Sequence, residues 1–226
     1  MSKLSSTTLF NFTDSFDHLK DNLLKGFYVS TIYEKLPKRN SGYSMPMVCF
    51  CDIPLGMIKE HLSWYGNFGI GISRTYAREH GVTPVFYTHR ESKLISALMK
   101  DKDSNPVAKN VFPLIKQFLG YQNFVDGKSK LKKFYDEHEW RYIPPEAKLQ
   151  FHFNKEKAKA EKEMIKQTFR LPFCNYNVIE YIIIESYSDI KPLLSVFDLI
   201  VKKDPRVNRE ILISKILTAK QIRKDF

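Results

Sequence analysis

The sequence predicts an α+β fold with a mixed, mainly antiparallel sheet and flanking helices. Strand-like and helix-like segments interleave along the 226 residues without the regular strand–helix–strand rhythm of a parallel sheet. No GxGxxG or P-loop motif joins a strand to a helix. Hydrophobic residues make up 43% of the chain and aromatic residues 14%, which is enough to build a sizeable core and argues against extended disorder.

The first half of the chain opens with a strand, TLFNFT (8–13), in which large apolar residues alternate. A helix follows, because Asp14 or Ser15 can cap its start, apolar residues recur on one face, and Gly26 can end it. The polar stretch 32–46 is typical of a loop. The elements expected after it are a buried strand at MVCFC (47–51), a short helix after Pro54, a strand at 68–73, a helix at 75–81 and a strand at 83–88.

The second half begins with a helical pattern over 92–119, interrupted by the turn-like DSNP and by Pro113, followed by a loop over 120–137. The remaining expected elements are a strand at HEWRYIPP (138–145), a polar helical segment near 146–170, a core strand at 178–186, an amphipathic helix at 187–203, a strand at 211–217 and a short terminal helix. We find no internal repeat and no long linker, so we expect a single α+β domain over residues 1–226.

The charge of the chain favours acidic partners. Thirty-six Lys and Arg residues against 25 Asp and Glu residues give 36 − 25 = +11. Such an excess suits nucleic acid, phosphates or an acidic protein, although no helix-turn-helix or zinc-finger pattern is present. No apolar run approaches the roughly 18 residues of a membrane span, and the N-terminus lacks a hydrophobic signal core. We therefore expect a cytoplasmic protein without a membrane partner.

Cysteine usage indicates packing rather than chemistry. The three cysteines, Cys49, Cys51 and Cys174, form no CxxC motif, and an odd number fits a reducing compartment. Cys49 and Cys51 would share one face of a strand, where neighbouring thiols seldom meet disulfide geometry. No nearby His or Cys pair completes a metal-ligand set, so we predict no metal site. A redox site and a catalytic thiol are the alternatives.

Three stretches carry candidate functional residues. Asn11 and Thr13 share one strand face and could bond a ribose or an amide beside a cleft, or could simply end the strand and cap the helix. The cluster WYGNFGIG (64–71), with Tyr65 as its candidate ligand-binding residue, could form a pocket wall in which aromatic rings stack on a flat ligand and glycines allow close approach. Its aromatic residues would serve equally well in a core.

The third stretch is YDEHEWRYIPP. Glu137, Glu139 and Arg141 have the spacing of side chains that project on one side of a strand. Two carboxylates beside a guanidinium can form a hydrogen-bond clamp, with one carboxylate held ionised. A surface strand end linked by salt bridges would have the same sequence.

These stretches, in this order, resemble the AbiGi-type abortive phage resistance family, described as the antitoxin partner in the AbiG system. The resemblance is carried by LFNFT with the following LLKGF, by PMVCFCDIPL, by His61 and YGNFGIGIS, by TPVFY, by EHEWRYIP and by the tail ILISKIL–TAKQI–RKDF. It implies a component of a toxin–antitoxin-like anti-phage defence system, with a cognate toxin or antitoxin as its protein partner.

The chain also resembles, more weakly, the ADP-ribosyltransferase superfamily, including the DarT toxins and the tRNA 2′-phosphotransferases. LFNFTDSFDHLKDNLLKGF is similar to their first strand and helix, and EHEWRY is similar to the late strand that presents the catalytic glutamate. This resemblance implies an ADP-ribosyltransferase-like fold with NAD as the candidate cofactor and Glu139, supported by Glu137, as the catalytic candidate. Where these enzymes have a histidine that holds NAD, this chain has Asn11.

Three functional hypotheses follow. In the first, an antitoxin binds and neutralises a partner without turnover. In the second, an ADP-ribosyltransferase or NAD-cleaving effector modifies nucleic acid or protein. Its catalytic candidates are Glu139 and Glu137, and its cofactor-binding candidates are Asn11, Thr13, Tyr65 and Arg141. In the third, the chain is a nucleic-acid-binding module.

Overall fold

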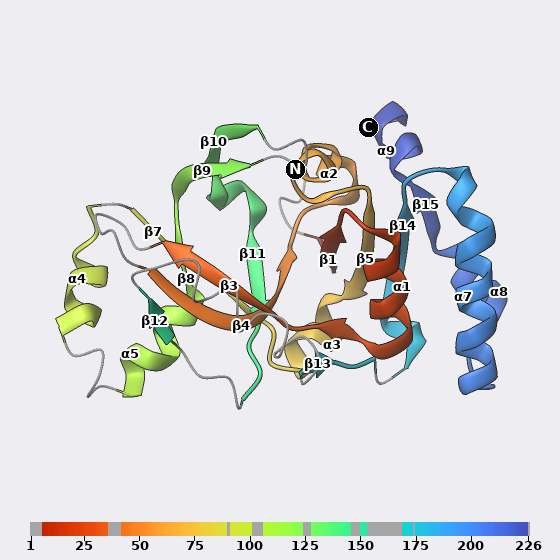
Figure 1. Cartoon of the computed structure of the whole chain (residues 1–226), viewed down its shortest axis with the longest axis horizontal. Helices are drawn as coiled ribbons and strands as arrows, with labels where there is room; N and C mark the ends of the chain where they lie inside the picture. Colours follow the sequence, from red (N-terminus) through yellow and green to blue (C-terminus); the bar gives the residue numbers. More distant parts are fainter. Residues whose placement is uncertain are drawn as a thin grey trace.

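The computed structural model describes residues 6–35, 42–89, 91–100, 106–123, 128–145, 150–152, 169–173 and 175–225. It confirms the α+β class, because most pairs of the sheet are antiparallel and helices flank it (Figure 1). Among the described residues, the large sheet contains nine strands: β1 (Thr8–Thr13), β3 (Ser30–Lys35), β4 (Gly42–Cys51), β5 (Phe68–Ser73), β6 (Thr83–Pro84), β11 (Glu139–Tyr142), β12 (Gln150–His152), β14 (Ile179–Ile184) and β15 (Ile216–Thr218).

The strands of the central path follow the order β15-β14-β5-β1-β4-β11-β6, and β3 and β12 also pair with β4. Only β14 and β15 pair in parallel among the described strands of this sheet. Three two-stranded sheets accompany it, formed by β2 (Phe27–Tyr28) with β13 (Arg170–Leu171), β7 (Phe86–Thr88) with β8 (Ile115–Gln117), and β9 (Leu119–Asn123) with β10 (Ser129–Lys133).

The helices are α1 (Phe16–Lys25), α2 (Lys59–Tyr65), α3 (Arg74–Glu79), α4 (Lys93–Lys100), α5 (Pro106–Val111), α7 (Ile190–Lys203), α8 (Arg209–Ser214) and α9 (Ala219–Asp225). Short 3-10 turns lie at η1 (Leu55–Met57), η2 (Phe112–Leu114), η3 (Phe134–Glu137), η4 (Tyr176–Val178) and η5 (Tyr187–Asp189). Figure 1 shows α4 and α5 at one end of the molecule and α7 and α8 at the other. No helix in the described part of the chain is long and apolar enough to cross a membrane.

In the part of the chain that the structure describes, buried apolar residues form three clusters. Leu9 of β1 packs in the cluster that contains residues of α1 and α7, whereas Phe10 packs in the cluster that contains residues of α2 and α9. Successive residues of β1 therefore face opposite sides of the sheet, as strand geometry requires. A third cluster around Tyr43 joins the first half of β4 to Phe112 and Ile115.

The long strand β4 belongs to two parts of the sheet. Its last residue, Cys51, lies opposite Phe10 of β1, and its residues 48–51 pair with β11. Its earlier residues pair with β3, where Met47 lies opposite Ser30. The predicted loop over 32–46 was therefore wrong in its described parts, because residues 30–35 and 42–46 form a strand pair.

Further sequence predictions need correction. Part of the predicted loop over 120–137 is a hairpin, β9–β10, and the predicted strand over 211–217 begins as helix α8 because the Asn208 side chain caps it. The helical pattern over 92–119 holds for α4 and α5 but ends before β8. In the predicted polar segment near 146–170, residues 150–152 and 170 are extended, and most of the rest lies outside the described residues.

Candidate functional site

A cavity of about 1250 Å³ lies beside β4, where β1 and β3 contact different parts of that strand. Residues of β1, β3, β4, α2, β8 and the β9–β10 hairpin line it. Its wall includes five of the six candidate residues that the sequence indicated: Asn11, Thr13, Tyr65, Glu137 and Glu139. The sixth, Arg141, is not among the lining residues that the structure describes.

Glu139 and Arg141 form a buried ion pair, as the strand spacing predicted. Arg141 Nε donates to Glu139 Oε1 at 2.7 Å, and the arginine and glutamate side chains are 0% and 4% exposed, respectively. The guanidinium also donates to the Glu34 carboxylate and to the Pro113 carbonyl oxygen. The guanidinium N–H groups of Arg141 therefore bind protein acceptors.

Lys116, on β8, connects three carboxylates in the cavity wall. Its Nζ lies 2.5 Å from Glu139 Oε2, 3.3 Å from Glu137 Oε2 and 3.9 Å from Glu34 Oε1. Both oxygens of Glu139 therefore have a cationic neighbour. Burial raises the pKa of Glu139, but the charges of Arg141 and Lys116 outweigh burial and hold that pKa well below its usual range.

Glu137 lies outside the strand, in η3, and is followed by His138 with a left-handed φ of 44°. It still reaches the same group, because Lys132 Nζ lies 2.5 Å from its Oε1 and the Tyr65 hydroxyl donates to that oxygen. Burial raises the pKa of Glu137, and the charges of Lys116 and Lys132 lower it by more, so the net shift is downward. The two glutamates are consequently both ionised near neutral pH.

We call six of these side chains the buried charge cluster: Glu34, Lys116, Lys132, Glu137, Glu139 and Arg141. The cluster contains three carboxylates and three cations, and its side chains are at most 14% exposed. A buried charge is tolerated when it is paired and hydrogen-bonded. The equal numbers of opposite charges explain how this group can lie inside the fold.

Asn11 and Thr13 lie on the opposite face of the sheet from Glu139. Phe10 and Glu139 both lie opposite Cys51, so their side chains share one face, and Asn11 alternates with Phe10 along β1. Asn11 Nδ2 donates to the Cys49 carbonyl oxygen at 2.9 Å, and Thr13 Oγ1 lies 3.3 Å from His18 Nδ1. Asn11, Thr13 and Glu139 all line the cavity, but Glu139 projects from one face of the sheet and Asn11 and Thr13 project from the other.

The glycines of WYGNFGIG accommodate core rings. Gly69 and Gly71 lie opposite Phe12 and Phe10, and a Cβ added at either glycine would come within 2.8 Å of the phenylalanine ring. These two glycines therefore make room for phenylalanine rings and not for a ligand. Tyr65 is the member of this stretch that lines the cavity.

The two cysteines of β4 belong to the packing of the core. Cys51 is buried, and Cys49 is half-buried and packs against the third apolar cluster. Burial raises the pKa of both thiols well above the ordinary value. Within the described residues, no group of three or more His, Cys, Asp or Glu side chains could hold a metal ion. Cys174 lies outside them.

The sequence indicated half of the charge cluster and missed Glu34, Lys116 and Lys132. Lys116 and Glu34 lie in segments that were predicted as helix and loop, and Lys132 lies in a predicted loop. The alternation in SKLKK (129–133) is the signal that could have placed Lys132 on one face of a strand. No local pattern relates Lys116 to glutamates elsewhere in the chain.

A family model described as "Putative abortive phage resistance protein AbiGi, antitoxin" matches residues 25–185. The abortive phage resistance protein AbiGi of Lactococcus lactis subsp. cremoris is 28% identical over 246 aligned residues, which cover 90% of this chain and 99% of that protein. No solved structure matches the chain. The region matched by the family model contains the whole buried charge cluster, whereas Asn11 and Thr13 precede it.

Proposed function

The chain belongs to the AbiGi family of abortive phage resistance proteins, and from this premise we propose that it acts as an antitoxin: it binds and neutralises a toxic partner protein in the cytoplasm and turns over no nucleotide. Membership of the family makes it a component of abortive-infection defence. The choice between binding and catalysis rests on the state of the cavity wall.

One observation carries the proposal: both carboxylate oxygens of Glu139 already contact a cation, one Arg141 and the other Lys116. A glutamate that is to bond a ribose hydroxyl and stabilise a developing cation needs an oxygen directed at the substrate. Glu139 would have to give up a buried ion pair to do so. The ion pairs with Arg141 and Lys116 therefore account for the ionised state of Glu139 without a catalytic role.

The scarcity of cations in the cavity lining favours the same conclusion. Among the described lining residues, Lys116 is the only Lys or Arg, and it faces three carboxylates. A dinucleotide carries a pyrophosphate, which proteins hold with uncommitted cations or with backbone N–H groups at a helix start. Asn11, at the position of the expected histidine, already donates to a backbone carbonyl.

Two measurements test this function together. The cognate toxin is expressed in cells with and without this chain, and growth is recorded. Purified chain is titrated with NAD by calorimetry and assayed for nicotinamide release. We expect growth to be restored and neither NAD binding nor release to be detected at millimolar NAD. Nicotinamide release by the wild type that Glu139→Gln abolishes would contradict the proposal.

The size of the cavity favours an ADP-ribosyltransferase-like or NAD-cleaving effector as the second candidate. A volume of about 1250 Å³ exceeds that of ordinary small-molecule pockets, which hold about 300–1,000 Å³. Glu137, Glu139 and Tyr65 line one wall. Under this candidate, substrate would displace Lys116 from Glu139. A soak or co-crystal with NAD would show whether the carboxylate turns toward a ribose.

A further inference from the structure

The β9–β10 hairpin has one face that is fixed to the protein. Lys132 lies opposite Gly120, and Lys130 lies opposite Gln122, so these four residues share a face. Lys132 pairs with Glu137, lies 4.4 Å from the centroid of the Trp64 ring, and donates to the Tyr65 hydroxyl. The Tyr65 hydroxyl in turn lies within hydrogen-bond distance of Gln122.

The other face of the hairpin is open, and its three apolar residues lie beside Ser129 and Lys133. Tyr121 lies directly opposite Leu131, and Leu119 lies opposite Lys133. Leu119 is 49% exposed, Tyr121 is 77% exposed and Leu131 is 50% exposed. All three line the mouth of the large cavity. Apolar side chains gathered in this way, next to a hollow, mark an interaction surface more often than apolar residues scattered singly.

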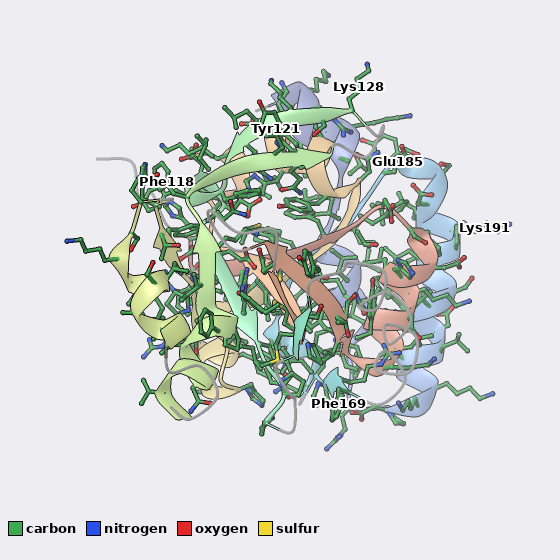
Figure 2. All side chains as sticks on the ribbon, turned by 60° about the vertical axis from the view of Figure 1, so that its left-hand side comes forward. Phe118, Tyr121, Lys128, Phe169, Glu185 and Lys191 are labelled. Carbon is green, nitrogen blue, oxygen red and sulfur yellow. The ribbon has the colours of Figure 1, made fainter. Side chains whose placement is uncertain are left out.

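The hairpin carries exposed lysines at its surface. Lys133 lies on the open face and pairs with Asp136, Lys130 lies on the other face, and Lys128 precedes β10. Figure 2 shows Tyr121 and Lys128 at the upper surface of the molecule, on this hairpin. Complementary charge steers association and sets the register of partners. The net charge of +11 and the lysines of the hairpin therefore favour a partner that carries carboxylates beside its own apolar residues.

The hairpin has also the geometry of an incomplete sheet. In the part of the chain that the structure describes, β9 and β10 pair only with each other. A two-stranded sheet is marginally stable by itself and gains from a third strand. An extended segment can add to such an edge through main-chain hydrogen bonds, while alternate side chains give specificity.

We propose that the open face of the β9–β10 hairpin, formed by Leu119, Tyr121 and Leu131, is the docking surface for the toxin that this antitoxin neutralises. The toxin presents an extended segment in which apolar residues alternate with carboxylates, and this segment lies along the hairpin at the mouth of the cavity. The inference rests on the proposed function and adds to it the surface and the chemistry of the partner.

Nucleic acid is the other macromolecule that tyrosine and lysine could recognise, through stacking and phosphate contacts. The composition of the face favours a protein. Two of its three apolar members, Leu119 and Leu131, have no flat ring on which a base could stack. Leu131 lies directly opposite Tyr121, and Leu119 lies two residues before it on β9.

The test uses the full-length chain and its cognate toxin. Leu131→Asp places a carboxylate in the open face, and Leu199→Asp on α7 is the matched control, because Leu199 is 48% exposed and Leu131 is 50% exposed. Tyr121→Ser removes the ring. Lys128→Glu with Lys130→Glu reverses the charge, and Lys202→Glu with Lys203→Glu is its control. Circular dichroism confirms that each variant is folded, and calorimetry with purified toxin and growth rescue give the readouts.

We expect Leu131→Asp and Tyr121→Ser each to weaken toxin binding about tenfold or more and to abolish rescue, since loss of a central apolar anchor has effects of that size. The charge reversal should weaken binding, and the two control variants should behave as wild type. If all hairpin variants bind toxin like wild type, the docking surface is wrong while the antitoxin function stands. If wild type neither binds toxin nor rescues growth, the proposed function fails, and this inference fails with it.

A fluorescent single-stranded oligonucleotide serves as the competing probe. If the hairpin variants lose oligonucleotide binding with a steep salt dependence and retain toxin binding, the surface belongs to nucleic acid, and the protein-docking proposal is overturned.

Discussion

Lys132 Nζ lies 2.5 Å from Glu137 Oε1, and this buried contact fastens the β9–β10 hairpin to the turn that precedes β11. The two residues are close in sequence but belong to different elements, β10 and η3. The contact connects the β9–β10 hairpin to the charged wall of the cavity. The next residue, Lys133, pairs with Asp136 at the surface, so a buried and an exposed contact can be compared at adjacent positions.

Lys132→Met should loosen the hairpin. Glu137 would keep Lys116 and Tyr65, so we expect a loss of about 2 kcal/mol in the free energy of unfolding, below the range for breaking a buried ion pair outright. Lys133→Met removes a surface pair with Asp136, in which the lysine and aspartate side chains are 48% and 62% exposed. This change should alter the free energy of unfolding by about 0.5 kcal/mol or less. Urea unfolding measures both, and equal losses would contradict the assignment of Lys132 as a buried fastening.

Arg141→Met should be the most damaging change in the charge cluster. It would leave Glu139 and Glu34 with only Lys116, and it would strip the Pro113 carbonyl of its donor. Breaking a buried pair in this way costs about 3–5 kcal/mol. Arg206→Met, in an exposed pair with Asp204, is the control and should leave the unfolding midpoint unchanged. Thermal unfolding followed by circular dichroism decides the comparison.

Alanine substitutions at two glycines with positive φ can distinguish the cost of backbone strain from the cost of steric overlap. Gly66 has φ of +111°, and a Cβ there would come within 2.3 Å of the Thr13 carbonyl oxygen. Gly81 has φ of +78°, and a Cβ added there would meet no atom within 4 Å. Gly81→Ala should therefore cost only the conformational penalty, about 1–2 kcal/mol. Gly66→Ala should cost clearly more. Similar losses in urea unfolding would show that β1 can move away from the end of α2.

His61 predicts a pH dependence. Burial lowers its pKa to about 4, and neither ring nitrogen has a hydrogen-bond partner among the described residues. The unfolded chain takes up a proton near pH 6.5 and the folded chain only near pH 4, so stability is lost as pH falls through this window. The full loss is about 3 kcal/mol. Glu137 and Glu139 also have lowered pKa values, but their effect on stability appears at pH values below about 4.5, the ordinary pKa of a glutamate.

The measurement is a urea unfolding series between pH 7 and 5, where the carboxylates contribute little. His61→Leu should flatten the dependence in this range. An unchanged slope in the variant would mean that another group is responsible.

Local signals predicted the elements that depend on local physics. Ser15 accepts a hydrogen bond from the His18 N–H and Gly26 ends α1, as the cap pattern indicated. The Glu139–Arg141 pair was also predictable, because side chains two apart on a strand share a face. The sequence also predicted β5 as a strand and β14 as a core strand, and both are largely buried.

The parts that the sequence did not predict depend on distant partners. β10 is rich in lysine and is stabilised by pairing with β9 and by the contact of Lys132 with Glu137, neither of which a window of neighbouring residues reveals. Lys116 meets glutamates from β3, η3 and β11. Asn11 and Glu139 were expected together, and only the register through Cys51 reveals that they lie on opposite faces.

The wide sequence separation within the charge cluster has a kinetic consequence. Arg141 meets Glu34 from 107 residues away, and Glu137 meets Tyr65, a neighbour of the cluster, from 72 residues away. Contacts that close such long loops form after much of the chain has already collapsed. Arg141→Met should therefore accelerate unfolding and leave the refolding rate nearly unchanged, as stopped-flow measurements would show. The cluster then determines how long a folded molecule survives, and has little influence on how quickly one is made.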